Sequence, residues 1–142
     1  MERLPEFIGN HAFLVSLFIV IITFLIWDIC SNMISGIKPL SPPEVTRLVN
    51  HENAALVDVR PNSDFASGHI INAKNIPSTE LAANLETLNR YKRQTVIIYC
   101  NNGGQSSAQA KLLMKQGFEQ VYYMKGGVIE WKNTQLPLVR KV

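Results

Sequence analysis

The stretch from Thr95 to Ser107 is the part of this sequence that most restricts how the chain can fold. Residues 96–99 form a short apolar run rich in β-branched side chains, which is typical of a buried β-strand. The run ends at Cys100 and is followed by the turn sequence Asn-Asn-Gly-Gly, after which residues 105–116 are predicted to form a helix. The sequence therefore predicts a strand, a tight turn and a helix, with a cysteine where the strand ends.

Cys100 stands where backbone amides can stabilise a negatively charged sulfur. Gly103 and Gly104 allow conformations that turn several N–H groups inwards, and the following helix adds partial positive charge at its N-terminus. Both effects favour the thiolate, which is the nucleophilic form of cysteine. The alternative is a small apolar residue packed at a strand end, as free cysteines often are. The glycine pair and the helix start favour the functional interpretation.

One rival chemistry can be tested by spacing. A cysteine phosphatase needs an arginine six residues after its cysteine, because the guanidinium binds the phosphoryl oxygens in a fork. That position is Ser106, and Gln105 precedes it. Neither residue is an arginine, so phosphate-ester hydrolysis and arsenate reduction are both disfavoured.

Composition restricts the partners that this chain can recognise. The 142 residues are 46% hydrophobic and 18% charged, with a net charge of +3. A mildly basic chain suits an anionic small substrate or membrane surface, and it lacks the Lys/Arg clusters with interleaved aromatic residues of a nucleic-acid binder. Cys30 lies beside an apolar segment and Cys100 in the candidate site, so we expect no structural disulfide between them. No His/Cys cluster has metal-ligand spacing, and the sequence predicts no metal and no cofactor.

An uncharged segment near the N-terminus covers residues 7–27 and ends at Trp27, where an interfacial aromatic anchor would lie. Since about 20 apolar residues span a bilayer core, the sequence predicts one transmembrane helix here. A cleaved signal peptide is the main alternative; Glu2 and Glu6 in the head, and the absence of a small-residue cleavage site, argue against it. The uniform apolarity also disfavours a helix buried in a soluble core.

The remaining sequence predicts a linker and one domain. We expect residues 1–30 to form the tail and transmembrane helix, residues 31–40 the linker, and residues 41–142 a single domain. Short apolar strands alternate with helices in this domain, which indicates an α/β fold with a parallel sheet and helices on both faces. The predicted strands are 55–59, 73–76, 96–99 and 120–124. The predicted helices are 42–50, about a dozen residues after Ser78 or Thr79, 105–116 and 128–131. A further short helix is expected to be capped by Asn62 or Ser63, to run through Phe65 and to be closed by Gly68. Cys100 and Arg60 both follow strands, and ligands bind beyond the carboxyl ends of such strands.

Three separated signatures make residues 41–133 resemble a rhodanese domain of the single-domain sulfurtransferase type. The signatures are Leu-Val-Asp-Val-Arg at 56–60 with Gly-His-Ile at 68–70, Val-Ile-Ile-Tyr-Cys at 96–100 with Gly103 and Ser106, and Gly126-Gly127 with Trp131. Together with the preceding apolar segment, the layout resembles small bacterial membrane-anchored rhodanese-like proteins.

This resemblance implies sulfur transfer, in which Cys100 takes up a sulfane sulfur as a persulfide and passes it to an acceptor. The implied donor is a small molecule such as thiosulfate or a protein persulfide. The implied substrate-binding residues are Asn101, Asn102, Gly103, Gly104, Gln105, Ser106 and Arg60. Gln105 stands where the family usually has an arginine; it can donate hydrogen bonds but has no charge to hold thiosulfate. Asp58 and His69 are expected to be structural residues near the site.

The sequence leaves two function classes open. The first is a membrane-anchored sulfurtransferase. The second is a catalytically weak or inactive rhodanese-like module that recruits membrane or cytoplasmic proteins, which Gln105 favours. Because an unpaired reactive thiol suits a reducing compartment, we expect a single-pass protein of the bacterial inner membrane with its C-terminal domain in the cytoplasm. The bilayer is then a partner through residues 7–27.

Overall fold

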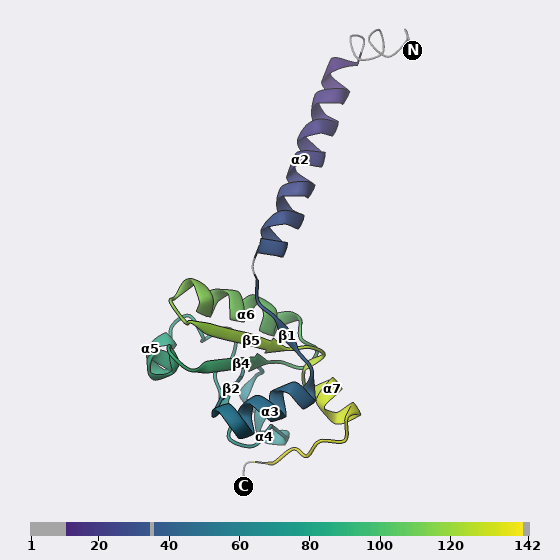
Figure 1. Ribbon diagram of the computed structural model, residues 1–142. Helices are drawn as coiled ribbons and strands as arrows, with labels where there is room; N and C mark the ends of the chain where they lie inside the picture. The colour runs from purple at the N-terminus through teal and green to yellow at the C-terminus, as the bar shows by residue number, and fades with distance from the viewer. Residues whose placement is uncertain (1–10, 35, 141–142) are drawn as a thin grey trace. The chain divides into compact units, whose positions relative to one another are not determined.

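The computed structural model describes residues 11–34 and 36–140 (Figure 1). The chain divides into two compact units, residues 1–36 and 37–142. The described part of the first unit contains one long helix, and the second unit contains a β-sheet with its covering helices. The predicted linker, residues 31–40, includes the end of the long helix and the first strand.

Helix α2 of the first unit runs from Ala12 to Ile34. In the ranges that the structure describes, no helix has both the length and the apolarity needed to cross a membrane. The transmembrane helix predicted over residues 7–27 is therefore not supported. Residues 7–10 lie outside the described residues, and the part of the uncharged run within α2, residues 12–27, covers about 24 Å at 1.5 Å per residue, against about 30 Å for a hydrocarbon core.

Five parallel strands form the sheet of the second unit, in the order β1-β5-β4-β2-β3. The strands are β1 (Pro39–Leu40), β2 (Ala55–Asp58), β3 (Lys74–Asn75), β4 (Thr95–Tyr99) and β5 (Gln120–Met124). In the central register, Leu56 of β2 lies beside Ile97 of β4, which lies beside Tyr122 of β5. The prediction of an α/β fold with a parallel sheet is confirmed, and each predicted strand is present.

The helices of the second unit are α3 (Pro42–Glu52), α4 (Asn62–Ser67), α5 (Leu85–Leu88), α6 (Gly104–Lys115) and α7 (Gly127–Asn133), with a 3₁₀ turn at Asn89–Tyr91. A capping box starts α3: the backbone N–H of Ser41 donates to Glu44 Oε2 at 2.8 Å, and the Ser41 hydroxyl donates to the same oxygen at 2.7 Å. The backbone hydrogen bond from Ser41 is the main cause of the lowered pKa of Glu44.

The prediction of a helix of about a dozen residues after Ser78 or Thr79 is wrong. The chain forms turns in this region, and α5 is only a single helical turn. The N–H of Ser78 donates to Val59 O at 2.9 Å, so the segment begins tied to the end of β2. The Asn84 side chain donates to Glu80 O at 3.1 Å, a local bond by which asparagine competes with a continuous helix.

Helices cover both faces of the sheet, and β4 faces both cores. Ile98 and Cys100 pack in a cluster with Leu113 of α6, while Ile97 and Tyr99 pack in the cluster to which α3 and α7 contribute. Figure 1 shows α6 on one side of the strands and α3 on the other. All the strands run the same way, so the segments that follow β2, β4 and β5 meet at one edge of the sheet.

Candidate functional site

Cys100 directly follows β4 and lies within the turn that leads into α6. The backbone N–H of Gly103 donates to its Sγ at 3.1 Å. Two oxygens that can accept from the thiol lie further away, Ser106 Oγ at 3.6 Å and Asn102 Oδ1 at 3.9 Å. The cysteine is 1% exposed, so its sulfur is held within the turn rather than projecting from it. The Gly103 amide is therefore a hydrogen-bond donor in direct contact with the sulfur.

The residues after Cys100 hold the turn in shape by bonding to one another. Gly103 has a left-handed backbone with φ of 92°, and its carbonyl accepts a bond of 2.9 Å from the buried Ser106 hydroxyl. The N–H of Gly104 donates to Asn102 Oδ1 at 3.2 Å. Gln105, in the first turn of α6, has an exposed side chain. These contacts place Ser106 within the frame of the loop and Gln105 on its surface.

The first turn of α7 supports the cysteine loop from a second side. The N–H of Val128 donates to Cys100 O at 2.9 Å, and the N–H of Ile129 donates to Asn101 O at 3.1 Å. Gly127 has a φ of +55°, and a β-carbon on it would collide with Cys100 O and lie 2.6 Å from the carbonyl carbon of Asn101. The sequence predicts a turn at these glycines, but their contact with the cysteine loop has no local sequence signal.

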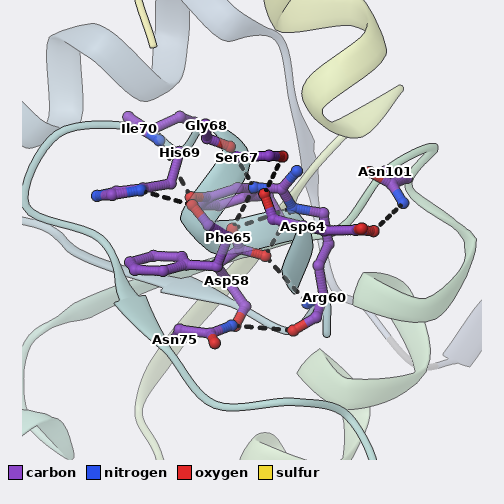
Figure 2. A network of polar contacts seen from close by, with 11 residues as sticks. Asp58, Arg60, Asp64, Phe65, Ser67, Gly68, His69, Ile70, Asn75 and Asn101 are labelled. Atoms are coloured by element: carbon purple, nitrogen blue, oxygen red, sulfur yellow. Dashed lines mark hydrogen bonds and ion pairs between the residues drawn. The ribbon is translucent and has the colours of Figure 1, made fainter. Parts of the chain in front are cut away.

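Asp58 and Arg60 form a buried ion pair at the carboxyl end of β2 (Figure 2). Arg60 Nη2 lies 2.7 Å from Asp58 Oδ2 and also donates to Gly68 O at 2.8 Å. The side chains are 5% and 0% exposed. Burial opposes the charge on Arg60, but the hydrogen bond and charge of Asp58 outweigh it and raise the pKa of Arg60. Arg60, predicted to bind substrate, thus has its guanidinium engaged by Asp58 and Gly68.

Two residues to which no sequence motif assigns a role, Asn75 and Tyr99, complete this network. Asn75 Nδ2 donates to Asp58 O at 3.0 Å and to Arg60 O at 2.9 Å, tying β3 to the end of β2. The Tyr99 hydroxyl accepts from the N–H of Ile70 at 3.3 Å. Burial, followed by the negative charge of Asp58, raises the pKa of Tyr99. Both lie in short strands, where sequence pattern indicates packing rather than polar contacts.

His69 lies in a structural setting. Its Nδ1 is 2.8 Å from Phe65 O, and its ring stacks on the Phe65 ring with centroids 3.7 Å apart. Its backbone exchanges two hydrogen bonds with Val139, at 2.9 and 2.8 Å. These contacts fix the turn whose Gly68 carbonyl accepts from Arg60.

Asn101 joins this network to the cysteine loop (Figure 2). Its Nδ2 donates to Asp64 Oδ2 of α4 at 3.2 Å. The structure thus brings Asp58, Arg60 and the cysteine loop to one edge of the sheet, with Asn101 and Asp64 between them. Within residues 11–34 and 36–140, no group of three or more His, Cys, Asp or Glu side chains could hold a metal ion.

This geometry agrees with what comparison to known proteins finds. The chain is 35% identical to the uncharacterized protein YibN of Escherichia coli strain K12 over 141 residues, which are 99% of each chain. It is 33% identical over 93 residues to a protein of Allochromatium vinosum named sulfurtransferase, covering 66% of this chain and 85% of that one. The crystal structure of a rhodanese-like domain protein from Staphylococcus aureus superposes with a TM-score of 0.66 at 27% identity, covering 75% of this chain and all of that one.

The sequence profile of the family described as Rhodanese-like domain matches residues 41–134. The match spans the strands β2 to β5, the cysteine loop and the turn that supports it. It agrees with the three signatures found in the sequence and with the fold of the Staphylococcus aureus domain. This chain belongs to the rhodanese-like domain family.

Proposed function

We propose that the protein is a sulfurtransferase that carries a sulfane sulfur on Cys100 as a persulfide. The observation that carries the proposal is the bond of 3.1 Å from the Gly103 N–H to Cys100 Sγ, at the carboxyl end of the central strand. A sulfur in this position has a donor for its negative charge and the N-terminus of α6 close by. Sulfur-transfer chemistry is plausible on independent grounds, since a relative is named sulfurtransferase.

The proposed reaction has two displacements at sulfur. The Cys100 thiolate attacks the sulfur that is to be transferred, and an S–S bond forms as the bond from that sulfur to the rest of the donor breaks. The broken bond is S–S in thiosulfate or a persulfide and C–S in mercaptopyruvate. Its electron pair leaves with the remaining fragment, which is sulfite, a thiolate or the enolate of pyruvate. An acceptor thiolate then attacks the outer sulfur of the persulfide. The new S–S bond forms on the acceptor, and Cys100 departs as the thiolate with which the cycle began.

The donor that we favour is a persulfide of a small thiol or of a protein rather than thiosulfate. Gln105 is exposed at the first turn of α6 and carries no charge to bind a dianion. Arg60 already binds Asp58 and the Gly68 carbonyl. A protein persulfide of the cytoplasm or membrane would make its carrier a partner of this domain.

Intact mass after incubation with a donor tests the proposal. Wild-type protein incubated with thiosulfate, mercaptopyruvate or a small-thiol persulfide should gain one sulfur atom, most completely with the persulfide. Cys100→Ser should gain none, whereas Cys30→Ser, the matched control, should gain it as the wild type does. Absence of the gain with all three donors would refute the proposal.

A non-catalytic module that recruits proteins is the second candidate. The observation that favours it is the burial of Cys100, which leaves 1% of the residue exposed. In this case the Cys100 thiol should react slowly with a general alkylating reagent in the folded protein. Equal recovery of bound proteins by wild type and Cys100→Ser, together with the absence of a persulfide, would favour this candidate.

We also propose that residues 7–27 attach the domain to the inner membrane of a bacterium, with residues 37–142 in the cytoplasm. The support comes from the uncharged sequence and from the apolar side chains exposed on α2, such as Phe13 at 79% and Trp27 at 75%. The structure lends no support to a spanning helix, so the proposal depends on experiment.

Fractionation and labelling test the attachment. The full chain should stay with the membrane fraction after an alkaline wash, and a chain lacking residues 1–36 should not. For sidedness, a Ser63→Cys variant without the two native cysteines offers one exposed thiol. It should react with an impermeant reagent only after the cells are opened; labelling of intact cells would reverse the placement.

A further inference from the structure

A hollow of about 590 Å³ lies beside the cysteine loop and has no role in the function proposed above. It is lined by Ser41, Pro42, Asn102, Lys125, Gly126 and Glu130. These residues come from the start of α3, from the cysteine loop and from the turn between β5 and α7. Its volume is in the range of about 300–1,000 Å³ that small-molecule sites have.

The hollow adjoins the cysteine loop through Asn102 and the turn that contains Gly126. Asn102 lines the hollow, and its Oδ1 lies 3.9 Å from Cys100 Sγ. Gly126 also lines it, in the turn whose next residues donate to the carbonyls of Cys100 and Asn101. A molecule in the hollow is therefore a neighbour of the loop that would hold the persulfide.

The charged groups of the hollow have opposite signs. Lys125 supplies an ammonium, and its backbone is fixed because its N–H donates to Leu40 O at 2.9 Å. Glu130 supplies a carboxylate, which accepts from Asn133 Nδ2 at 3.3 Å. Pro42 adds an apolar side chain to the lining. A ligand that carries both a carboxylate and an ammonium would find a partner for each.

We propose that this hollow is the acceptor subsite and that it binds a low-molecular-weight thiol of the amino-acid or short-peptide class. The inference rests on the proposed sulfur transfer and names the acceptor for it. Lys125 would bind the carboxylate of this thiol, Glu130 would bind its ammonium, and Asn102 would lie next to its sulfur. Asn102, Lys125 and Glu130 are thus specificity-determining residues for the second half of the reaction.

The transfer to this acceptor balances without a further reagent. The acceptor thiol loses its proton to water, and its sulfur attacks the outer sulfur of the Cys100 persulfide. One S–S bond forms as the other breaks, the electron pair of the broken bond remains on Cys100, and the acceptor leaves as a persulfide. Neither an oxidant nor a reductant is consumed, because sulfane sulfur only changes its carrier.

Discharge of persulfide-loaded full-length protein tests the assignment. Four thiols are compared: L-cysteine, 3-mercaptopropionate, cysteamine and 2-mercaptoethanol, the last being the uncharged reference. Lys125→Gln should lower the rates with L-cysteine and 3-mercaptopropionate, relative to 2-mercaptoethanol, by about two- to fivefold, as expected for an exposed ion pair. Glu130→Gln should lower the relative rates with L-cysteine and cysteamine by a similar factor.

Lys132→Gln is the matched control, because Lys132 is exposed on α7 and does not line the hollow. Its relative rates should equal those of the wild type. If Lys125→Gln and Glu130→Gln also had the relative rates of the wild type, the subsite assignment would be wrong, and the sulfurtransferase proposal would be unaffected. Failure of the wild type to take up sulfur would instead refute the proposed function. Glutathione, added to the series, distinguishes an amino-acid acceptor from a short-peptide acceptor. A larger loss of rate in Lys125→Gln with glutathione than with L-cysteine assigns a peptide thiol, and a smaller loss assigns an amino acid.

A binding measurement gives a readout independent of sulfur transfer. The Cys100→Ser protein is titrated with S-methyl-L-cysteine, which has both charges but no reactive thiol. The amide signals of Asn102 and Gly126 should shift in a saturable way, and Lys125→Gln should weaken the binding about two- to fivefold. Binding that this variant leaves unchanged, or shifts confined to another part of the domain, would contradict the assignment.

Discussion

At the scale of single residues, the Asp58–Arg60 pair is the arrangement most sensitive to substitution. Both side chains lie almost fully out of water, and Arg60 also donates to the Gly68 carbonyl. Removing one charge of a buried pair leaves the other without compensation, which costs far more than loss of an exposed pair.

We therefore predict that Asp58→Asn lowers the free energy of unfolding by about 3–5 kcal/mol. The exposed control Glu86→Gln should stay within about 0.5 kcal/mol of the wild type. Equilibrium unfolding in urea measures both. A loss below about 1 kcal/mol for Asp58→Asn would mean that Arg60 finds another anion or water in its place.

The raised pKa of Tyr99 leads us to predict a loss of stability at alkaline pH. Its pKa is raised in the folded protein, chiefly by burial, so the folded state retains the proton that the unfolded state releases above about pH 10. The stability that this residue contributes is complete below about pH 10 and falls as the pH rises further. Unfolding in urea at pH 8, 10 and 11 should show a steeper decline for wild type than for Tyr99→Phe.

The half-buried Tyr122 provides the control for this experiment. Tyr122→Phe should keep the steep decline of the wild type, because the buried hydroxyl of Tyr99 is unchanged. Parallel curves for wild type and Tyr99→Phe would show that another group causes the alkaline loss.

Sequence points to candidate site residues that have a chemical signature and assigns no role to residues that act through the fold. Cys100 follows from its strand and glycine turn, and a structural role for Asp58 agrees with its buried pair. The contact of Tyr99 is missed because its partner, Ile70, is distant in sequence. The contacts of Asn75 are missed because its partners lie at the carboxyl end of another strand, β2. No local pattern encodes such contacts.

At the scale of elements, the first turn of α7 holds the cysteine loop in position. Its amides bind the carbonyls of Cys100 and Asn101, and Gly127 leaves no room for a β-carbon against them. The loop therefore depends on two helices, α6 through its own N-terminus and α7 through this contact.

Gly127→Ala should lower the free energy of unfolding by about 2–5 kcal/mol, since backbone strain and overpacking add. It should also reduce uptake of sulfur by Cys100. Gly117→Ala is the control: Gly117 has φ of +87°, and a β-carbon added there would meet nothing within 4 Å, so only the left-handed conformation is penalised, by about 1–2 kcal/mol. Equal losses in the two variants would show that the contact with the loop contributes nothing.

The elements that sequence predicts well are those whose ends carry a local signal. The box of Ser41 and Glu44 starts α3, and Gly117, with its left-handed backbone, follows the end of α6. The helix prediction after Ser78 is wrong because the leucines of this segment have helical spacing, whereas its backbone is hydrogen-bonded to the end of β2. A bond to another strand cannot be found from spacing alone.

At the scale of the whole molecule, the described residues of the two core clusters all lie in the second unit. Both apolar clusters of the sheet are closed by helices of the same unit. We predict that residues 37–142 alone unfold cooperatively, with a midpoint within a few degrees of that of the full chain. Scanning calorimetry measures this, and a broad transition or binding of a hydrophobic dye would contradict it.

The order of the strands in this domain is beyond what the sequence analysis supplies. Alternating strands and helices predict a parallel sheet, and this is confirmed. The sequence prediction omits β1, because a two-residue strand that begins with a proline gives no periodic signal. Its place beside β5 depends on contacts formed only when the chain is folded.

That pairing has a consequence for synthesis on the ribosome. Leu40 of β1 lies beside Met124 of β5, so the earliest strand to be translated joins a partner made about 80 residues later. At a translation rate of about 5–20 residues per second, roughly 4–16 s pass between the synthesis of β1 and that of its partner. Until β2 and β4 have also been synthesised, α3 lacks the strands that it will cover, and its apolar side chains stay exposed on the emerging polypeptide.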